Sequence, residues 1–154
     1  LAKPSELDLA ALRKLATEKR RMAFLARRLR ADAGRGSAVG RIKIEKIDAN
    51  YVVVNGSDAA SLRKGPGIYD DVPFPGMPGT TAIAGHRTTY GAPFRRINKV
   101  EKTRIVKPTA LEVIKRVSYD RLVLSACHPL YSAAKRFIVF ARLVAAQARG
   151  AATL

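Results

Sequence analysis

Two apolar segments of the chain stop at side chains that can do covalent chemistry. The run over residues 80–85 ends at His86, and the run from Leu122 to Ala126 ends at Cys127. Arg136 opens the next apolar run. Because runs of this length and composition predict β-strands, all three side chains are expected at strand ends, on one rim of a barrel. A thiol, an imidazole and a guanidinium together suit nucleophilic attack on an amide.

Each of the three groups has a distinct part in such a reaction. The thiolate is the nucleophile, and a thiol with an ordinary pKa is ionised to only a few per cent at neutral pH, so a nearby imidazole and cation are expected helpers. Attack on an amide creates an oxyanion, which a fixed guanidinium stabilises. The leaving amine needs a proton. These steps predict Cys127 as nucleophile, His86 as acid/base and Arg136 as the oxyanion partner.

The same residues also have ordinary structural explanations. A single cysteine among apolar residues is commonly a buried packing residue, and Cys127 has no second cysteine with which to form an intrachain disulfide. A histidine at a strand end is commonly a surface or hydrogen-bonded residue, and Arg136 is one of 29 Lys and Arg residues. Composition alone favours these explanations, so the chemical hypothesis depends on the surrounding segments.

The chain divides into a helical and a strand-rich part. From Pro4 to about Ala33 the absence of glycine and an apolar stripe at helical spacing predict one amphipathic helix, capped by Ser5. The predicted units are the helix over residues 1–33, a Gly-rich linker over 34–40, a β-barrel domain over 41–144 and an Ala-rich tail over 145–154.

Strands are expected wherever β-branched residues gather between turn residues. The density of Gly and Pro from Arg63 to Gly79 argues against regular structure there. The predicted strands are Arg41–Ile47, Tyr51–Val54, Thr80–Gly85, Leu111–Val117, Asp120–Ala126 and Arg136–Val144, with a weaker one at Arg104–Val106. A small closed or nearly closed barrel accommodates that pattern.

The charge balance is strongly basic, with 29 Lys and Arg residues against 12 Asp and Glu residues and a formal net charge of +17. Such a field attracts polyanions without sequence specificity, so nucleic acid, a teichoic-acid wall and an anionic lipid surface all stay open as partners. The acidic residues form no ligand-like cluster, so no metal site or other cofactor is expected.

Two motifs and their order carry a family resemblance. The segment AIAGHRTTYGAPF, residues 82–94, is followed by L-x-L-x-x-C-H-P at 122–129 and by KRFIVFA at 135–141. Together with GRIKI at 40–44 and ASLRKGPGIY at 60–69, this order resembles the sortase family over roughly residues 40–144. The match is most similar to the class E sortases of actinobacteria.

That resemblance implies both a fold and a reaction. Sortases are cysteine transpeptidases with an eight-stranded β-barrel, anchored by an N-terminal segment on the outer face of the Gram-positive plasma membrane. They cut a sorting motif such as LPXTG between Thr and Gly through a Cys thioester and pass it to an amine. The acceptor, a peptidoglycan precursor or a pilin lysine, decides between cell-wall anchoring and pilus assembly. The chain begins with Leu1 rather than Met, so an anchor is expected to have preceded it.

The resemblance also assigns substrate-binding residues. Tyr90 matches a class E tyrosine associated with a preference for LAXTG over LPXTG, and His128 follows the class E Cys-His-Pro pattern. The family motif T-L-x-T-C reads VLSAC here, so Ser125 and Ala126 stand where the family places residues that position substrate. Neighbouring residues on a strand face opposite sides, which argues against Ser125 simply replacing the missing threonine hydroxyl.

A hairpin that the family carries after Val100 is missing from the sequence, which passes directly to EKTRIVKPT. A deletion and a sequence that records only part of the natural chain both explain this. We therefore expect a mainly β, sortase-type barrel with one hairpin fewer.

Two other functions stay open for such a chain. One is a non-catalytic basic barrel that binds nucleic acid or wall polymer, and the other is a cysteine hydrolase. Nucleic acid is the less expected partner because clustered aromatic strand residues are absent.

Overall fold

Two helices precede a single seven-stranded sheet in the computed structural model, which describes residues 5–99 and 103–145. Helix α1 spans Glu6–Arg13 and α2 spans Glu18–Asp32. Ser5 caps α1, as predicted, by accepting from the Asp8 backbone N–H. The prediction of one continuous helix is wrong, because the Thr17 side chain accepts from the Arg20 N–H and starts a second helix.

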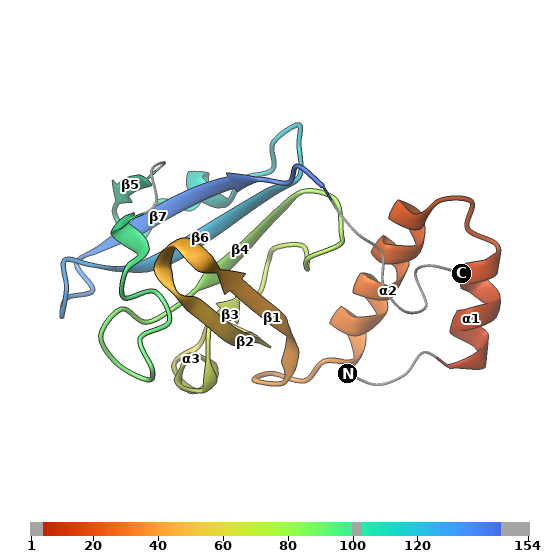
Figure 1. The fold of residues 1–154 in the computed structure, drawn as a ribbon, viewed down its shortest axis with the longest axis horizontal. Helices are drawn as coiled ribbons and strands as arrows, with labels where there is room; N and C mark the ends of the chain where they lie inside the picture. Colours follow the sequence, from red (N-terminus) through yellow and green to blue (C-terminus); the bar gives the residue numbers. More distant parts are fainter. Residues whose placement is uncertain (1–4, 100–102, 146–154) are drawn as a thin grey trace.

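Helix α2 lies between α1 and the sheet (Figure 1). An ion pair of 2.9 Å joins Asp8 of α1 to Arg28 of α2, and Leu12 of α1 is fully buried. Toward the sheet, the Arg30 guanidinium donates to the main-chain oxygens of Val72 and Asp70, at 2.9 and 3.0 Å. The helices are therefore fixed to the loop that leads into the fourth strand.

The strands form one sheet in the order β1-β2-β3-β4-β6-β7-β5. Pairing is parallel between β2 and β3 and between β4 and β6, and antiparallel elsewhere. The strands are β1 (Ala38–Ile44), β2 (Ala49–Asn55), β3 (Gly67–Ile68), β4 (Thr80–Ala84), β5 (Thr103–Val106), β6 (Arg121–His128) and β7 (Lys135–Arg142). The short helices are η1 (Glu45–Ile47), α3 (Ala59–Lys64), η2 (Ile97–Lys99) and η3 (Leu111–Ile114).

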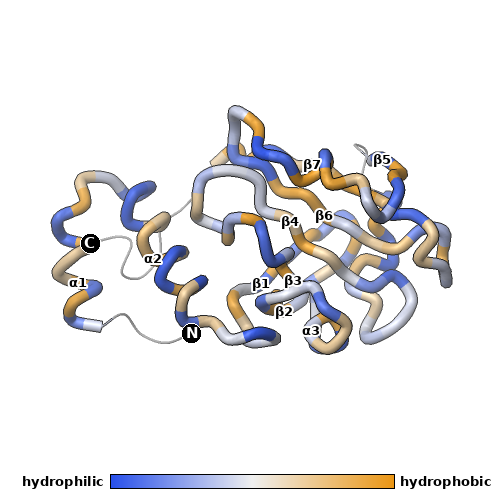
Figure 2. Tube along the Cα trace, turned by 180° about the vertical axis from the view of Figure 1, so that it is seen from behind, coloured by the Kyte–Doolittle hydropathy of each residue, from blue (hydrophilic) through white to orange (hydrophobic). Residues whose placement is uncertain are grey.

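The sheet curls around one apolar core. Val39 and Val53, from β1 and β2, belong to the same buried cluster as Val123 and Val139, from β6 and β7. Figure 2 shows the apolar segments concentrated in the sheet, while α1 and α2 alternate between polar and apolar turns. The mainly β, barrel-like prediction is confirmed. Within the described residues β1 and β5 are the two ends of the strand order and do not pair with each other.

Most predicted strands are present, with ends shifted by a few residues, and β1 begins inside the predicted linker. The strand predicted at Leu111–Val117 is wrong: residues Leu111–Ile114 form the 3-10 helix η3. The main-chain oxygens of Val113 and Lys115 accept from the Arg121 guanidinium, so they need no neighbouring strand. The segment expected to lack regular structure contains β3 and the end of α3. The Ala-rich tail was predicted over residues 145–154, and all of it after residue 145 lies outside the described residues.

The close approach of β3 to the loop after β2 gives a stability test. An added Cβ at Gly67 would overlap the carbonyl oxygen of Gly56, a main-chain atom that cannot rotate away. We expect Gly67→Ala to lower the free energy of unfolding by about 1–3 kcal/mol. Gly40→Ala in β1 is the matched control, since no atom lies within 4 Å of the added methyl group. Urea unfolding of both proteins measures the effect, and equal stabilities would contradict this packing.

Candidate active site

The register between β4 and β6 brings two of the predicted residues together. Ala84 lies opposite Ser125, and the N–H of Gly85 donates to the main-chain oxygen of Ser125 at 2.9 Å. Continuing the same offset by two residues sets His86 level with Cys127. Because the strands are parallel and both apolar runs stop there, the imidazole and the thiol belong to the same end of the sheet.

Arg136 is brought to the same place by the pairing of β6 with β7. Cys127 and Arg136 are direct cross-strand partners in this antiparallel pair. Side chains of such partners point to the same face of a sheet. Cys127, a free and partly buried thiol, therefore stands between the strand that leads to His86 and the strand that carries Arg136. The strand register thus sets the three residues at neighbouring strand ends, and their catalytic roles stay a prediction.

The two faces of β6 and β7 have different contents. One face, called the pocket face here, carries Ser125 and Cys127 from β6 and Arg136 and Ile138 from β7. The opposite face carries Ala126 and His128 with their partners Phe137 and Lys135. Ser125 therefore shares a face with the nucleophile, and the Ala126 methyl group does not. His128 also lies on the opposite face, with its ring 6.0 Å from that of Phe137.

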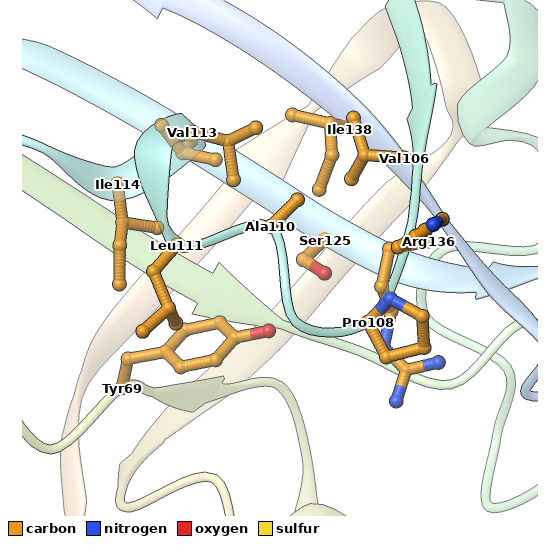
Figure 3. Close-up of a pocket in the computed structure, with 12 residues that line it drawn as sticks. Tyr69, Val106, Pro108, Ala110, Leu111, Val113, Ile114, Ser125, Arg136 and Ile138 are labelled. Carbon is orange, nitrogen blue, oxygen red and sulfur yellow. The ribbon is translucent and has the colours of Figure 1, made fainter.

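A small pocket lies on the same face of β6 and β7, and it is lined by Ser125 and by Arg136, the cross-strand partner of Cys127. Figure 3 shows Ser125 in its middle, Arg136 and Pro108 at one end, and Tyr69, Leu111 and Ile114 toward the other. Its remaining lining is mostly aliphatic and comes from the segment between β5 and β6 as well as from β6 and β7. Arg136 donates from Nη1 to the main-chain oxygens of Ala133 and Lys135, at 2.9 and 3.1 Å. These bonds hold the guanidinium at one end of the pocket, near the segment that joins β6 to β7.

His86 is oriented by a neighbour that sequence reasoning missed. Its Nδ1 lies 3.2 Å from Oγ1 of Thr89, while its Nε2 is buried with no hydrogen-bond partner. Burial disfavours the charged ring and lowers the pKa of His86 from its ordinary value. One ring nitrogen is thus held by Thr89, and the other has no partner among the residues that the structure describes.

Tyr90 sits next to His86 in a constrained loop. The ring centroids are 5.0 Å apart, and Tyr90 is about half exposed, at 51%. Tyr90 and Ala92 adopt left-handed backbone conformations, with φ of 50° and 43°, which cost roughly 1–2 kcal/mol each. The Tyr51 hydroxyl donates to the Gly91 oxygen at 2.8 Å and ties this loop to β2. The exposed phenol is thereby presented beside the imidazole.

Arg87 is a second residue that sequence reasoning missed. It follows His86 directly, is only 6% exposed, and donates from Nη1 to the main-chain oxygen of Cys127 at 3.2 Å. Its position beside His86 in AIAGHRTTYGAPF was the only signal in the sequence, and nothing there distinguishes it from the many exposed arginines. Its burial beneath the nucleophile is visible only in the fold.

Known proteins are similar to this chain in both sequence and fold. A family model described as "Sortase domain" matches residues 42–107. Sortase D of Bacillus subtilis is 31% identical over 132 residues, which are 71% of this chain and 65% of that protein's length. The chain therefore spans slightly less than two thirds of this relative.

Solved structures agree with that match. Sortase E from Streptomyces avermitilis has 28% sequence identity and a TM-score of 0.63, with 73% of this chain and 91% of that chain covered. A lid mutant of sortase A from Corynebacterium diphtheriae has 18% identity and a TM-score of 0.69, covers 93% of this chain and 97% of that one, and shows the shared fold. With the matched domain, the curated relative and the fold in agreement, this chain belongs to the sortase family.

Proposed function

We propose that the chain is a transpeptidase that cleaves a C-terminal sorting motif of the LAXTG or LPXTG kind between Thr and Gly and transfers the Thr end to an amine. The observation that carries this proposal is the order of side chains across three adjacent strand ends. Cys127 lies between the strand leading to His86 and its direct partner Arg136. Family membership supports the same reaction.

In the first half of the reaction, the Cys127 thiolate attacks the carbonyl carbon of the motif's Thr. A C–S bond forms and the carbonyl oxygen becomes an oxyanion, which the Arg136 guanidinium stabilises without being able to lose its proton. The C–N bond to Gly then breaks, and the protonated His86 gives its proton to the departing amine. The products are a Thr thioester on Cys127 and a free Gly amine.

In the second half, an acceptor amine attacks the thioester carbonyl. The neutral His86 left by the first step takes a proton from that amine, an amide forms, and the sulfur leaves as a thiolate. Both groups return to their starting states. A peptidoglycan precursor or a pilin lysine is the acceptor class that we propose.

Substrate positioning involves the groups around the pocket. The Ser125 hydroxyl lies on the same face as Cys127 and lines the pocket, so it supports the sorting motif there. Tyr90 presents its phenol beside His86 and can donate to a substrate carbonyl. Ala126 and His128 lie on the opposite face of β6, so in this proposal they shape the strand end and not the groove.

The family to which the chain belongs is membrane-associated at the cell surface, and we propose the outer face of a Gram-positive plasma membrane as the site of action. A formal net charge of +17 suits work among wall and lipid polyanions. Across residues 5–99 and 103–145, no helix combines the length and apolar character needed to cross a bilayer.

The direct test is turnover of an LAXTG-containing peptide with a Gly-based amine, followed by mass spectrometry for the thioester and the ligated product. We expect both species with the unaltered protein. Cys127→Ala is expected to lose the thioester and at least about 10³-fold of the ligation rate, because the nucleophile is gone. Circular dichroism checks that the variant is folded. Ligation by Cys127→Ala, or release of free Thr acid without any ligated product, would contradict the proposal.

The burial of His86 predicts a pH dependence. Because burial lowers its pKa below the ordinary 6.5, the low-pH limb of kcat/KM should have its midpoint below pH 6.5. Activity is lost as pH falls through that limb, since imidazole and thiol are then both protonated and no thiolate remains. The chain has two histidines, so in His128→Asn the remaining imidazole can be titrated by NMR. A midpoint for His86 at or above 6.5 would refute this prediction.

The place of Tyr90 beside His86 predicts a specificity effect. We expect Tyr90→Phe to lower the ratio of kcat/KM for LAXTG over LPXTG peptides by about fivefold to tenfold, because the donor to the substrate carbonyl is removed. Tyr119→Phe is the matched control, since Tyr119 contacts Arg142 at the far end of β7. An unchanged ratio in Tyr90→Phe would assign Tyr90 to loop packing instead.

A further inference from the structure

A buried positive charge lies behind the nucleophile and has no part in the reaction as described so far. Arg87 is 6% exposed, and its Nε is buried without a hydrogen-bond partner. Among the residues that the structure describes, no carboxylate forms an ion pair with it. Burying an unpaired charge is costly, by several kcal/mol in general. A group that costs this much and packs against the reactive strand is a candidate for function.

Arg87 contacts both strands at the end of the sheet where Cys127 lies. Nη1 donates to the Cys127 main-chain oxygen at 3.2 Å, and the guanidinium carbon lies 5.4 Å from the centre of the Phe137 ring. Phe137 is the cross-strand partner of Ala126. Arg87 thus holds the ends of β6 and β7 together from the opposite face, whereas Arg136 is on the pocket face with the sulfur.

The charges of the Arg87 guanidinium and an ionised Cys127 also attract each other. Burial lowers the pKa of the Arg87 guanidinium, and attraction to an ionised Cys127 opposes this. A cation near a cysteine favours the thiolate, which is the reactive form. The His128 ring also lies near Phe137, with the two ring centres 6.0 Å apart.

We propose that Arg87 is a positioning residue for the nucleophile: it fixes the main chain at Cys127, and its buried charge favours the attacking thiolate. Arg136 acts on the substrate oxyanion, and Arg87 acts through the cysteine itself. The inference rests on the proposed function for its effect on turnover, but the reactivity of the Cys127 sulfur can be measured without any substrate.

Three substitutions separate the charge from the hydrogen bond. Arg87→Lys keeps the charge, Arg87→Gln keeps an N–H donor without charge, and Arg87→Met keeps neither. The matched control is Arg30→Met on α2, because the Arg30 guanidinium likewise donates to main-chain oxygens and lies 5.9 Å from the centre of a phenylalanine ring. Each protein is assayed for alkylation of Cys127 by iodoacetamide at pH 7, for kcat and KM with an LAXTG peptide, and for Tm.

We expect Arg87→Met and Arg87→Gln to lower the alkylation rate and kcat by about tenfold, while Arg87→Lys stays within about threefold of the unaltered protein. KM should change little, because Arg87 does not face the substrate pocket. Tm of Arg87→Met should stay the same or rise, since an unpaired buried charge is removed. Arg30→Met should leave alkylation and kcat unchanged.

Two results would overturn the inference. One is an alkylation rate and kcat within twofold of the unaltered protein in Arg87→Met. The other is full retention in Arg87→Gln, which would remove the role of the charge. If Arg87→Met does not fold, the comparison of Arg87→Gln with Arg87→Lys gives the same decision. If no peptide is ligated by any protein, the proposed function fails while the alkylation rates still decide the role of Arg87.

Discussion

The parallel pairing of β4 with β6 is the constraint on which the candidate active site depends. The two strands are separated in sequence by residues 85–120, and only their hydrogen-bonded register sets His86 level with Cys127. A shift of the register by one residue would turn every side chain of one strand to the other face. The hydrogen bond from the Gly85 N–H to the main-chain oxygen of Ser125 continues this pairing one residue past the end of β4. The relative position of imidazole and thiol is therefore a property of the sheet.

The same strand end serves two purposes because β6 has two packed faces. On the pocket face, Ser125, Cys127 and Arg136 stand beside a mostly apolar pocket. On the opposite face, Ala126 and Phe137 are buried, and the Arg87 guanidinium donates to the main-chain oxygen of Cys127. Strand alternation thus separates the groups that meet substrate from those that support the nucleophile.

Local sequence predicted where the strands stop, and the ordered motifs around those points singled out His86, Cys127 and Arg136 as the proposed site. Long-range partners could not be predicted in this way. The β-branched residues of Leu111–Val117 favour a strand, but Arg121 satisfies carbonyl groups of this segment and a 3-10 helix forms instead. The break between α1 and α2 occurs at Thr17, whose side chain caps α2, although no glycine or proline marks a break there in the sequence. The burial of Arg87 was hidden because sequence gives no sign of which arginine the fold encloses.

The topology of the sheet also sets the order in which the site can assemble during folding. Strands β6 and β7 are joined by the short segment 129–134, so Cys127 and Arg136 are local partners whose pairing closes a small loop. His86 reaches them only when β4 docks across a long crossover, and pairings of high sequence separation form slowly. A folding intermediate with only the β6–β7 hairpin would hold the cysteine without its acid/base. Completion of the reactive centre is thereby coupled to a long-range step of folding.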